Sequence, residues 1–405
     1  MTSASSSRLA FVGFAASLIY PSTAVFEKVG LPYLAAYVLL APFLLWSALH
    51  LVPRLRARIS PRAALIGLVL LHVALLCAHL WVHPQIDTSG FRLFGLQFGA
   101  SDGDDAIDLA ITEALAGRYP YHATTFLGNP ITPMPGSILL AVPFYVLGSS
   151  SIQSVFWLMI FFWAVAAHHR DWFTAAIVSF SVFVLSPNVI YQVLRGGDYI
   201  TNSVSILVFS GLLLESTRRG HASWQRALWA LLLGVSLSSR LNFLPLLPLL
   251  LGALARASSL TGACSTLALV LAAFGALTVP AVLYDPSGFS PLHTLSKLDV
   301  TGRLPWAPYL VALLAFALST ALAVRRESYE LRVFMRDVFF IEAFLAVTGF
   351  VLASISSGRV NLDYPHFGVL FMFFGIFAFA PGSIPISQES FVASFARTPR
   401  AAPTS

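Results

Sequence analysis

A dense group of carboxylates stands out in a chain that is 57% hydrophobic and only 10% charged. Carboxylates can act as general bases, bind metal ions or complement the dipole of a helix N-terminus. One helix dipole accounts for one or two of them, and charge beside a membrane is costly to keep. The group therefore predicts a functional acidic site. Its members are Asp102, Asp104, Asp105, Asp108 and Glu113.

The acidic group fits a short helix over 104–116. Ser101 or Asp102 is expected to cap its first turn, and a glycine and a proline follow its end. Asp104 and Asp108 are four residues apart, so they share one face of this helix. The other positions are mostly apolar, which predicts that the helix lies on or in the membrane surface.

A proline-rich loop, RYPYHATTFLGNPITPMPG, follows the acidic helix and is expected to fold back over the membrane. Its candidate substrate-binding residues are Tyr121, His122 and Asn129, of which the aromatic ones suit either an interfacial belt or a wall that stacks on a sugar. For a single aromatic residue, an interfacial belt is the commoner explanation. A divalent metal is left open, because ligands are at hand although no spacing demands one: Asp102, Asp104, His122 and His366.

Three arginines are expected on the same side of the membrane as the acidic helix. Arg195 lies in LRGGDYITN, Arg240 in SLSSRLNFLPLLP and Arg359 just before VNLDYPHF. A lone arginine at a helix end often only reaches the headgroups. Converging guanidinium groups instead bind phosphate oxygens bidentately, which predicts a phosphate clamp centred on Arg240. Asp198 and His366 lie in the same segments and complete the candidate binding residues.

The elements that must position these residues are membrane helices. Apolar runs long enough to cross about 30 Å of hydrocarbon recur along the chain, so the predicted fold class is an all-α polytopic membrane protein. Basic cytoplasmic loops explain the net charge of +6 better than nucleic-acid binding does. The two cysteines, Cys77 and Cys264, exclude a disulfide framework.

Clusters of arginine between the apolar runs orient the chain. With all of these clusters in the cytoplasm, about 12 spans alternate across the membrane. The apolar stretch 135–148 is too short for a full crossing and is expected to be a re-entrant half-helix. Residues 1–386 then form one transmembrane domain with an outer loop at 84–135, and 387–405 form a disordered cytoplasmic tail. The expected spans are 9–25, 31–51, 61–82, 152–167, 173–193, 200–214, 227–238, 241–254, 260–283, 305–324, 338–353 and 364–381.

The order of the motifs resembles a known family. DGD, GRYPY and GNPITPMPG come before a short apolar run, and RGGDYITN and SRLNFLPLLP follow it. Over about 94–251, this order is similar to the membrane-embedded glycosyltransferases of the GT-C superfamily, in particular to polyprenyl-phosphate-dependent mannosyl- and arabinosyltransferase-like members. The resemblance implies transfer of a hexose or pentose from a polyprenyl-phosphate donor to a glycan, lipid or protein acceptor. It also implies inversion at the sugar and a site on the outer face of a bacterial inner membrane.

The resemblance implies roles for the candidate residues as well. Asp104 would act as general base on the acceptor hydroxyl, with Asp102 as the second choice and Asp105 beside them. Arg240, helped by Arg195 or Arg359, would hold the phosphate leaving group and offset its growing charge.

Other classes of function stay open. A secondary transporter has a similar number of spans, and Glu342 is an intramembrane acid that suits a proton path. A non-catalytic scaffold or receptor would not need clustered carboxylates opposite arginines. The sequence lacks GxxxxGK[ST], HExxH and GxSxG, which argues against ATP hydrolysis, zinc proteolysis and ordinary serine hydrolysis.

Overall fold

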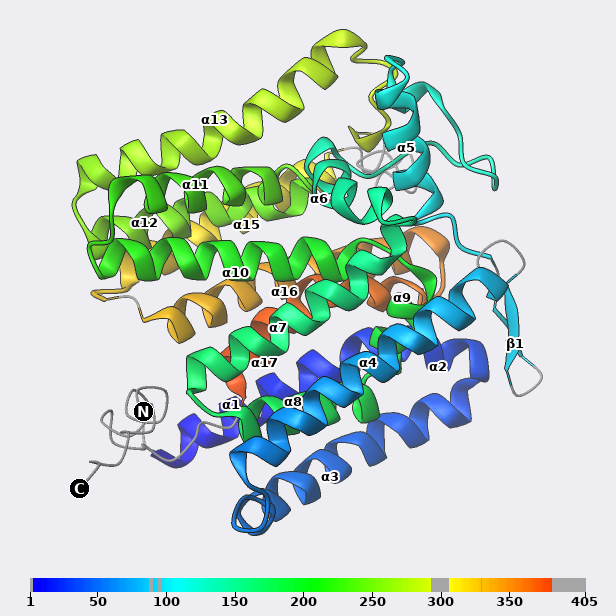
Figure 1. Ribbon diagram of the computed structural model, residues 1–405, viewed down its shortest axis with the longest axis vertical. Coiled ribbons are helices and arrows are strands. Elements are labelled where there is room, and N and C mark those ends of the chain that lie inside the picture. The colour runs from blue at the N-terminus through cyan, green and yellow to red at the C-terminus, as the bar shows by residue number, and fades with distance from the viewer. Residues whose placement is uncertain are drawn as a thin grey trace, which may run out of the picture.

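Helices form nearly all of the structure, a computed structural model (Figure 1). The predicted all-helical fold class is confirmed apart from one antiparallel hairpin, β1 (Phe91–Leu93) and β2 (Leu96–Phe98). The tail predicted at 387–405 lies outside the described residues. The structure describes residues 3–86, 90–93, 96–98, 100–292, 306–328 and 330–380.

Long α-helices alternate with short helical pieces along the chain. The α-helices are α1 (Ser3–Ile19), α2 (Thr23–Val29), α3 (Leu31–Arg56), α4 (Pro61–Ile86), α5 (Asp105–Leu115), α6 (Pro135–Val146), α7 (Gln153–His169), α8 (Trp172–Leu185), α9 (Pro187–Arg195), α10 (Tyr199–Arg218), α11 (Ser223–Leu237), α12 (Leu247–Ala257), α13 (Leu260–Tyr284), α15 (Ala307–Arg325), α16 (Leu331–Ser357) and α17 (Val369–Phe379). The 3-10 helices are η1 (Tyr20–Ser22), η2 (Pro120–His122), η3 (Ser150–Ile152), η4 (Leu241–Leu246), η5 (Ser290–Leu292) and η6 (Tyr364–Gly368).

Among the described residues, eight helical segments are long and apolar enough to cross a membrane, and α8 with α9 makes a ninth if the bent pair is one span. The chain is therefore a polytopic membrane protein, as predicted. The count of about 12 spans stays a prediction, because three further apolar segments are shorter than a full crossing requires. These three are Pro135–Val146, Leu241–Ala257 and Tyr364–Phe379.

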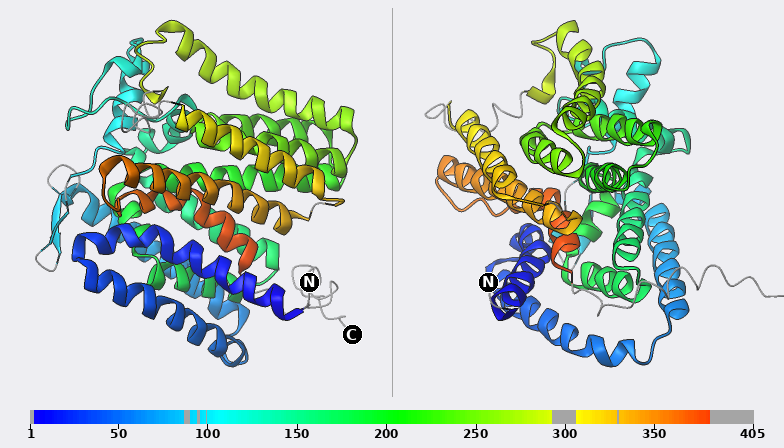
Figure 2. Two further views of the ribbon diagram at one scale, coloured as in Figure 1. Left: turned by 180° about the vertical axis from the view of Figure 1, so that it is seen from behind. Right: turned by 90° about the vertical axis from the view of Figure 1, so that its left-hand side faces the viewer.

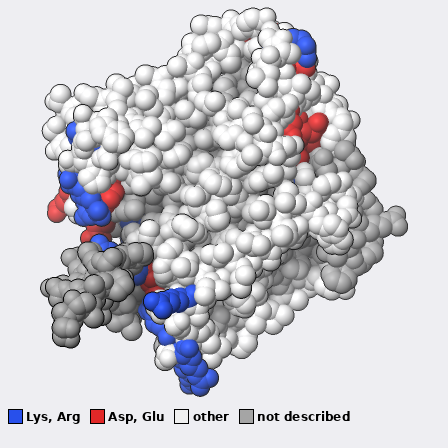
Figure 3. All heavy atoms as spheres, in the orientation of Figure 1, with Lys and Arg blue, Asp and Glu red and all other residues white. Residues whose placement is uncertain are grey.

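The long helices lie side by side and place charge at their two ends. Figure 1 shows α5, α6 and the hairpin at one end, here called the acidic end. The other end, here called the basic end, holds the last turns of α3, α7, α10 and α15, and the view from behind shows the same layering (Figure 2). On the face drawn in Figure 3, Lys, Arg, Asp and Glu of the described residues lie toward these ends, and the described surface between them is uncharged. Such a band is what a hydrocarbon layer requires.

The core is centred on α17, whose residues are all buried. Its sequence, VLFMFFGIFAF, is apolar on every side, which is typical of a helix enclosed by other helices. It packs against α1, α10 and α16. Phe373 meets Phe161 edge to face with ring centroids 4.9 Å apart, and Phe371 meets Phe339 in the same way at 5.4 Å. These contacts fix the centre of the bundle.

The predicted span 173–193 is broken in the structure. α8 ends at Leu185 and α9 begins at Pro187, and the two helices are inclined by 85°. Proline at the first position of α9 keeps the preceding residue out of the helical region, and Ser186 has φ −127° and ψ 73°. The predicted span is therefore bent at Ser186 and is not one straight helix, because α9 turns away from α8 at the acidic end.

The bounds of the acidic helix are close to the predicted ones, but its N-cap residue differs. α5 begins and ends within one residue of the expected bounds 104–116. The residue at its N-cap is Asp104, whose side chain makes no capping hydrogen bond. The predicted cap by Ser101 or Asp102 is wrong, because the Asp102 carboxylate binds a neighbouring loop instead.

The short helix α6 contacts the end of α11 backbone to backbone. The Gly136 amide donates to the Ser238 carbonyl oxygen at 3.0 Å. A Cβ on Gly136 would lie 2.1 Å from the carbonyl oxygen of Val235, so only glycine fits there. This contact ties α6 to the turn that leads into η4.

We expect Gly136→Ala to lower the free energy of unfolding by about 1–3 kcal/mol, because an added methyl group forces two backbones apart. Gly67→Ala is the matched control, since a Cβ on Gly67 of α4 meets nothing within 4 Å. Alanine also favours the helix at that position. Thermal unfolding of both variants in detergent measures the difference, and equal melting temperatures would contradict the close approach.

Candidate functional site

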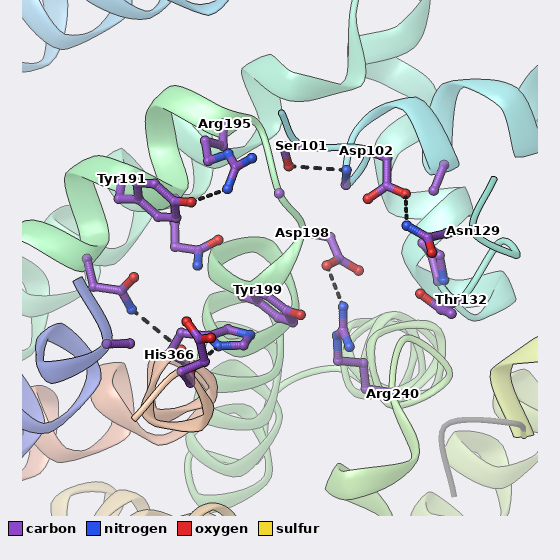
Figure 4. A pocket seen from close by; sticks show the side chains of 18 of the residues that line it. Ser101, Asp102, Asn129, Thr132, Tyr191, Arg195, Asp198, Tyr199, Arg240 and His366 are labelled. Atoms are coloured by element: carbon purple, nitrogen blue, oxygen red, sulfur yellow. Dashed lines mark hydrogen bonds and ion pairs between the residues drawn. The ribbon is translucent and has the colours of Figure 1, made fainter. Parts of the chain in front are cut away.

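A cavity of about 530 Å³ lies at the acidic end. Segments far apart in the sequence enclose it: the turn before α5, the loop before α6, α9, the start of α10, the turn before η4, and η6. Its volume is typical of small-molecule sites. Figure 4 shows its side chains pointing toward a shared space. The predicted site residues that line it are Asp102, Asn129, Arg195, Asp198, Arg240 and His366.

Asp102 is fixed by one oxygen and uncommitted at the other. Its Oδ2 accepts hydrogen bonds from Thr125 Oγ1 at 2.7 Å and from Asn129 Nδ2 at 2.8 Å. Its Oδ1 accepts none from the described residues. The side chain is half-buried in the cavity wall (Figure 4). A carboxylate held in this way is oriented and still able to accept a proton.

Asp198 and Arg240 form a buried ion pair in the same wall. Arg240 Nη2 donates to Asp198 Oδ1 at 2.6 Å, and the other carboxylate oxygen accepts from Ser137 Oγ and Asn202 Nδ2 at 2.7 and 2.9 Å. Burial opposes ionisation of Asp198, but the Arg240 guanidinium and these hydrogen bonds outweigh it and hold the pKa of Asp198 below its ordinary value. Asp198 is therefore ionised, and both of its carboxylate oxygens are hydrogen-bonded within the protein.

Arg240 keeps binding capacity beyond this ion pair. Its guanidinium stacks over the Tyr199 ring, 4.4 Å from the ring centroid. Its Nε is buried and donates to no described residue. A guanidinium carries five N–H donors in a planar fork, and an anionic group is the acceptor it binds most strongly. The geometry thus presents an oriented cation with donors to spare.

The helix α9 contributes a polar face of which the sequence predicted only Arg195. Asn188, Tyr191, Gln192 and Arg195 all line the cavity. Arg195 donates to the Tyr191 hydroxyl and lies over that ring, 4.9 Å from its centroid. The four residues follow the spacing i, i+3, i+4 and i+7, which marks one face of a helix. Assigning this segment to a span hid the signal, although Pro187 already indicated a new helix.

The wall opposite Asp102 comes from η6. Asn188 Nδ2 donates to the His366 carbonyl oxygen at 3.5 Å, and the Tyr199 and His366 rings are 5.9 Å apart. His366 Nδ1 lies 2.5 Å from the Asp363 carbonyl oxygen, so this nitrogen carries the proton. These contacts join η6 to α9 and α10 at the cavity.

Asp104 lies outside the cavity lining, although sequence reasoning favoured it as the base. Its Oδ2 is 2.9 Å from His83 Nε2, while His83 Nδ1 faces the Leu194 carbonyl oxygen at 3.0 Å. Both ring nitrogens thus meet oxygen acceptors, which requires an imidazolium or a protonated Asp104. On the next turn, Asp108 accepts from the Ser150 amide at 3.1 Å, and burial raises the pKa of Asp108. Both carboxylates attach α5 to its neighbours.

The other predicted residues also lie away from the cavity lining. Asp105 accepts from a backbone amide of the loop after α5. Tyr121 is buried in a small apolar cluster. His122 Nε2 is 2.9 Å from Asp285 Oδ2, and this contact is the main cause that lowers the pKa of Asp285. Arg359 is exposed beyond the end of α16.

The candidate metal ligands do not converge. Among the described residues, no three His, Cys, Asp or Glu side chains form a group that could hold a metal ion. Each of the four predicted ligands instead has a partner of its own: Asp102 with Asn129, Asp104 with His83, His122 with Asp285, and His366 with Asp363.

The fold and the cavity define a class: a polytopic membrane protein with a charged, small-molecule-sized site where its apolar bundle ends. No family model, curated protein or solved structure matches the chain. The chemistry of the site must therefore carry the functional argument.

The contribution of the Asp198–Arg240 ion pair to the free energy of unfolding depends on pH. In the native protein the pKa of Asp198 is depressed, so its contribution is complete above the unfolded value of about 3.9 and is lost only at lower pH. Arg240→Met leaves a buried carboxylate without its cation, and we expect a loss of about 3 kcal/mol at pH 7.

Burial without the cation raises the pKa of Asp198 in Arg240→Met, so the folded variant binds a proton that the unfolded chain lacks. Lowering the pH from 8 to 5 should then raise the melting temperature of this variant relative to the native protein. Arg359→Met, which removes an exposed arginine outside the cavity, is the control. Parallel pH profiles for all three proteins would contradict the prediction.

Proposed function

We propose that the cavity at the acidic end is the active site of a membrane glycosyltransferase of the GT-C type. The enzyme transfers a sugar from a polyprenyl-phosphate donor to an acceptor hydroxyl on the outer face of the membrane. One observation carries the proposal. Asp102, with one uncommitted oxygen, shares a cavity with the arginines Arg195 and Arg240. A base and cations in one site are what displacement of a phosphate leaving group requires.

The surroundings of the cavity support a lipid-linked donor. The site lies where an apolar helical bundle ends, so a prenyl chain can stay in hydrocarbon while the phosphate and sugar enter a polar cavity. The lining combines guanidinium, carboxylate, amide and phenol groups, which can bind both phosphate and sugar hydroxyls. The cavity volume of about 530 Å³ accommodates a small ligand of this kind.

The reaction we propose is a single displacement. Asp102 takes the proton of the acceptor hydroxyl, and the acceptor oxygen forms a bond to the anomeric carbon. The bond from that carbon to the phosphate oxygen breaks, and its electron pair leaves with the polyprenyl phosphate. Arg240 and Arg195 offset the charge that grows on this phosphate. Attack from the face opposite the leaving group inverts the anomeric configuration.

This assignment moves the base from Asp104 to Asp102. The Asp104 carboxylate pairs with His83 and does not line the cavity, whereas Asp102 keeps an oxygen uncommitted there. Asp104 then acts as a positioning residue, because it attaches the first turn of α5 to α4 next to Asp102. Asp198 is also a positioning residue, since it orients Arg240.

We expect Asp102→Asn to lower kcat by about 10²–10⁴-fold, the usual contribution of a general base, with little change in KM. The measurement is sugar transfer by the purified protein in lipid, offered a panel of polyprenyl-phosphate sugars. Glu113→Gln is the matched control, since Glu113 is a carboxylate of α5, the helix that follows Asp102, pairs with Arg118 and does not line the cavity.

Asp104→Asn separates the two candidate bases. An asparagine amide can donate to a neutral His83, so this variant should fold and keep most of its turnover. Loss of turnover in Asp104→Asn with retention in Asp102→Asn would return the base to Asp104. Full activity of both variants would show that neither Asp102 nor Asp104 is the general base.

A secondary transporter is the second candidate, favoured by one buried carboxyl group. Glu342 in α16 accepts from Asn242 Nδ2 at 2.8 Å through Oε2, and its Oε1 is buried with no hydrogen-bond partner among the described residues. Intramembrane carboxyl groups of this kind occur in proton relays. Solute uptake into vesicles that Glu342→Gln abolishes, without sugar transfer from any donor, would favour this function.

A further inference from the structure

A second cavity, of about 550 Å³, lies at the basic end. It is formed where α7, α10 and α12 end, where α16 begins, and beside the last turn of α17. None of its lining residues belongs to the cavity at the acidic end. It is therefore a separate site, at the other end of α10.

The wall of this basic-end cavity is apolar and deep. Its lining includes Leu207, Gly211, Met335 and Phe377. Along α10 the lining runs from Leu207 to Arg218, which is about 17 Å of helix. One leaflet of a bilayer is about 15 Å deep, half of the hydrocarbon core. The cavity thus has the depth and the polarity that a lipid chain requires.

The mouth of the cavity carries an excess of positive charge. Its lining has a formal charge of +2, four arginines against two glutamates: Arg170, Arg218, Arg219 and Arg332 against Glu215 and Glu330. Arg218 and Arg219 both bind Glu215, with the shortest contacts at 2.9 and 2.5 Å. Arg332 donates to two carbonyl oxygens at the end of α17. The mouth is thus suited to an anion beside an apolar slot.

Arg170 is the arginine of this mouth that is left for a ligand. Its side chain makes no hydrogen bond or ion pair with any described residue, and its backbone N–H donates to the Ala166 carbonyl oxygen at the end of α7. It is also the one non-glycine among the described residues with a left-handed backbone, at φ 52°. It ends α7, at a position where glycine is the residue most often found. Arginine is more strained than glycine in this conformation.

We infer that the basic-end cavity binds an anionic phospholipid, with its phosphate at Arg170 and Arg332 and an acyl chain along α10 and α16. Guanidinium groups supply charge-assisted hydrogen bonds to the phosphate, and Leu207, Gly211 and Met335 line the apolar slot for the chain. A zwitterionic lipid of the same chain length lacks the net negative charge that the mouth complements. This inference does not depend on the proposed glycosyl transfer, because its test reads lipid binding and not turnover.

The test is a titration of the delipidated full-length protein in detergent, followed by its melting temperature. Dioleoyl phosphatidylglycerol should raise the melting temperature at lower concentration and further than dioleoyl phosphatidylcholine does. Arg170→Gly should shift the phosphatidylglycerol midpoint about ten-fold upward, because a charge-assisted hydrogen bond is lost. Its melting temperature without lipid should not fall, since glycine suits φ 52°.

Two further variants complete the design. Arg58→Gly removes the same charge from an exposed position at the basic end outside the cavity, and it should respond to lipid as the native protein does. Gly211→Leu fills the apolar slot, and it should lose the response although Arg170 is intact.

Several results would overturn the inference. Equal responses to the two lipids would show that the cavity does not bind the phosphate at Arg170. Equal shifts of the phosphatidylglycerol midpoint in Arg170→Gly and Arg58→Gly would show the same. An equal response to glycerol 3-phosphate, which has no acyl chain, would make the cavity a site for soluble phosphate. A lipid response that appears only after removal of residues 387–405 would assign the cavity to the chain's own tail.

Discussion

The carboxylate of Asp198 is the constraint on which the acidic end depends. It is buried, so each of its oxygens must be satisfied by the protein, and the donors come from three places in the chain. Ser137 reaches it from α6, Asn202 from α10, and Arg240 from the turn before η4. The hydrogen bonds to this one carboxylate thus hold three elements together. The close approach at Gly136 completes the arrangement, because it attaches α6 to the same turn.

The hydrogen bonds of the acidic end divide its carboxylates into two kinds. Asp198 is paired with Arg240, and Asp104 lies against His83 through one oxygen, while its other oxygen is buried outside the cavity lining. Asp102 keeps one oxygen uncommitted in the cavity, and proton transfer to it costs no contact. Arg240 is likewise held by one nitrogen and keeps other donors. The groups best placed to react are therefore those that line the cavity and that the fold orients but does not saturate.

The helix α10 connects the two cavities of the described structure. It begins beside Asp198 at the acidic end and ends with Glu215 and Arg218 at the basic end. It is also the most buried of the candidate spans, with 78% of its window enclosed by the protein. Enclosure by neighbouring helices keeps its buried polar residues, such as Asn202 and Ser203, away from lipid.

The sequence by itself determined the membrane class, the long spans, the position of α5 and the involvement of Asp102, Asp198 and Arg240 in one site. The class, the spans and α5 follow from local properties, since hydropathy, helical period and charge are read within one stretch of chain. The shared site follows from the predicted topology, which places the three segments on one side of the membrane. Tertiary structure alone decided that Asp104 faces His83 while Asp102 faces the cavity, although the two are neighbours in sequence. It also decided that the polar face of α9 enters the site. The reason is that the hydrogen-bond partners of a polar side chain come from distant segments of the chain, and no local pattern specifies them.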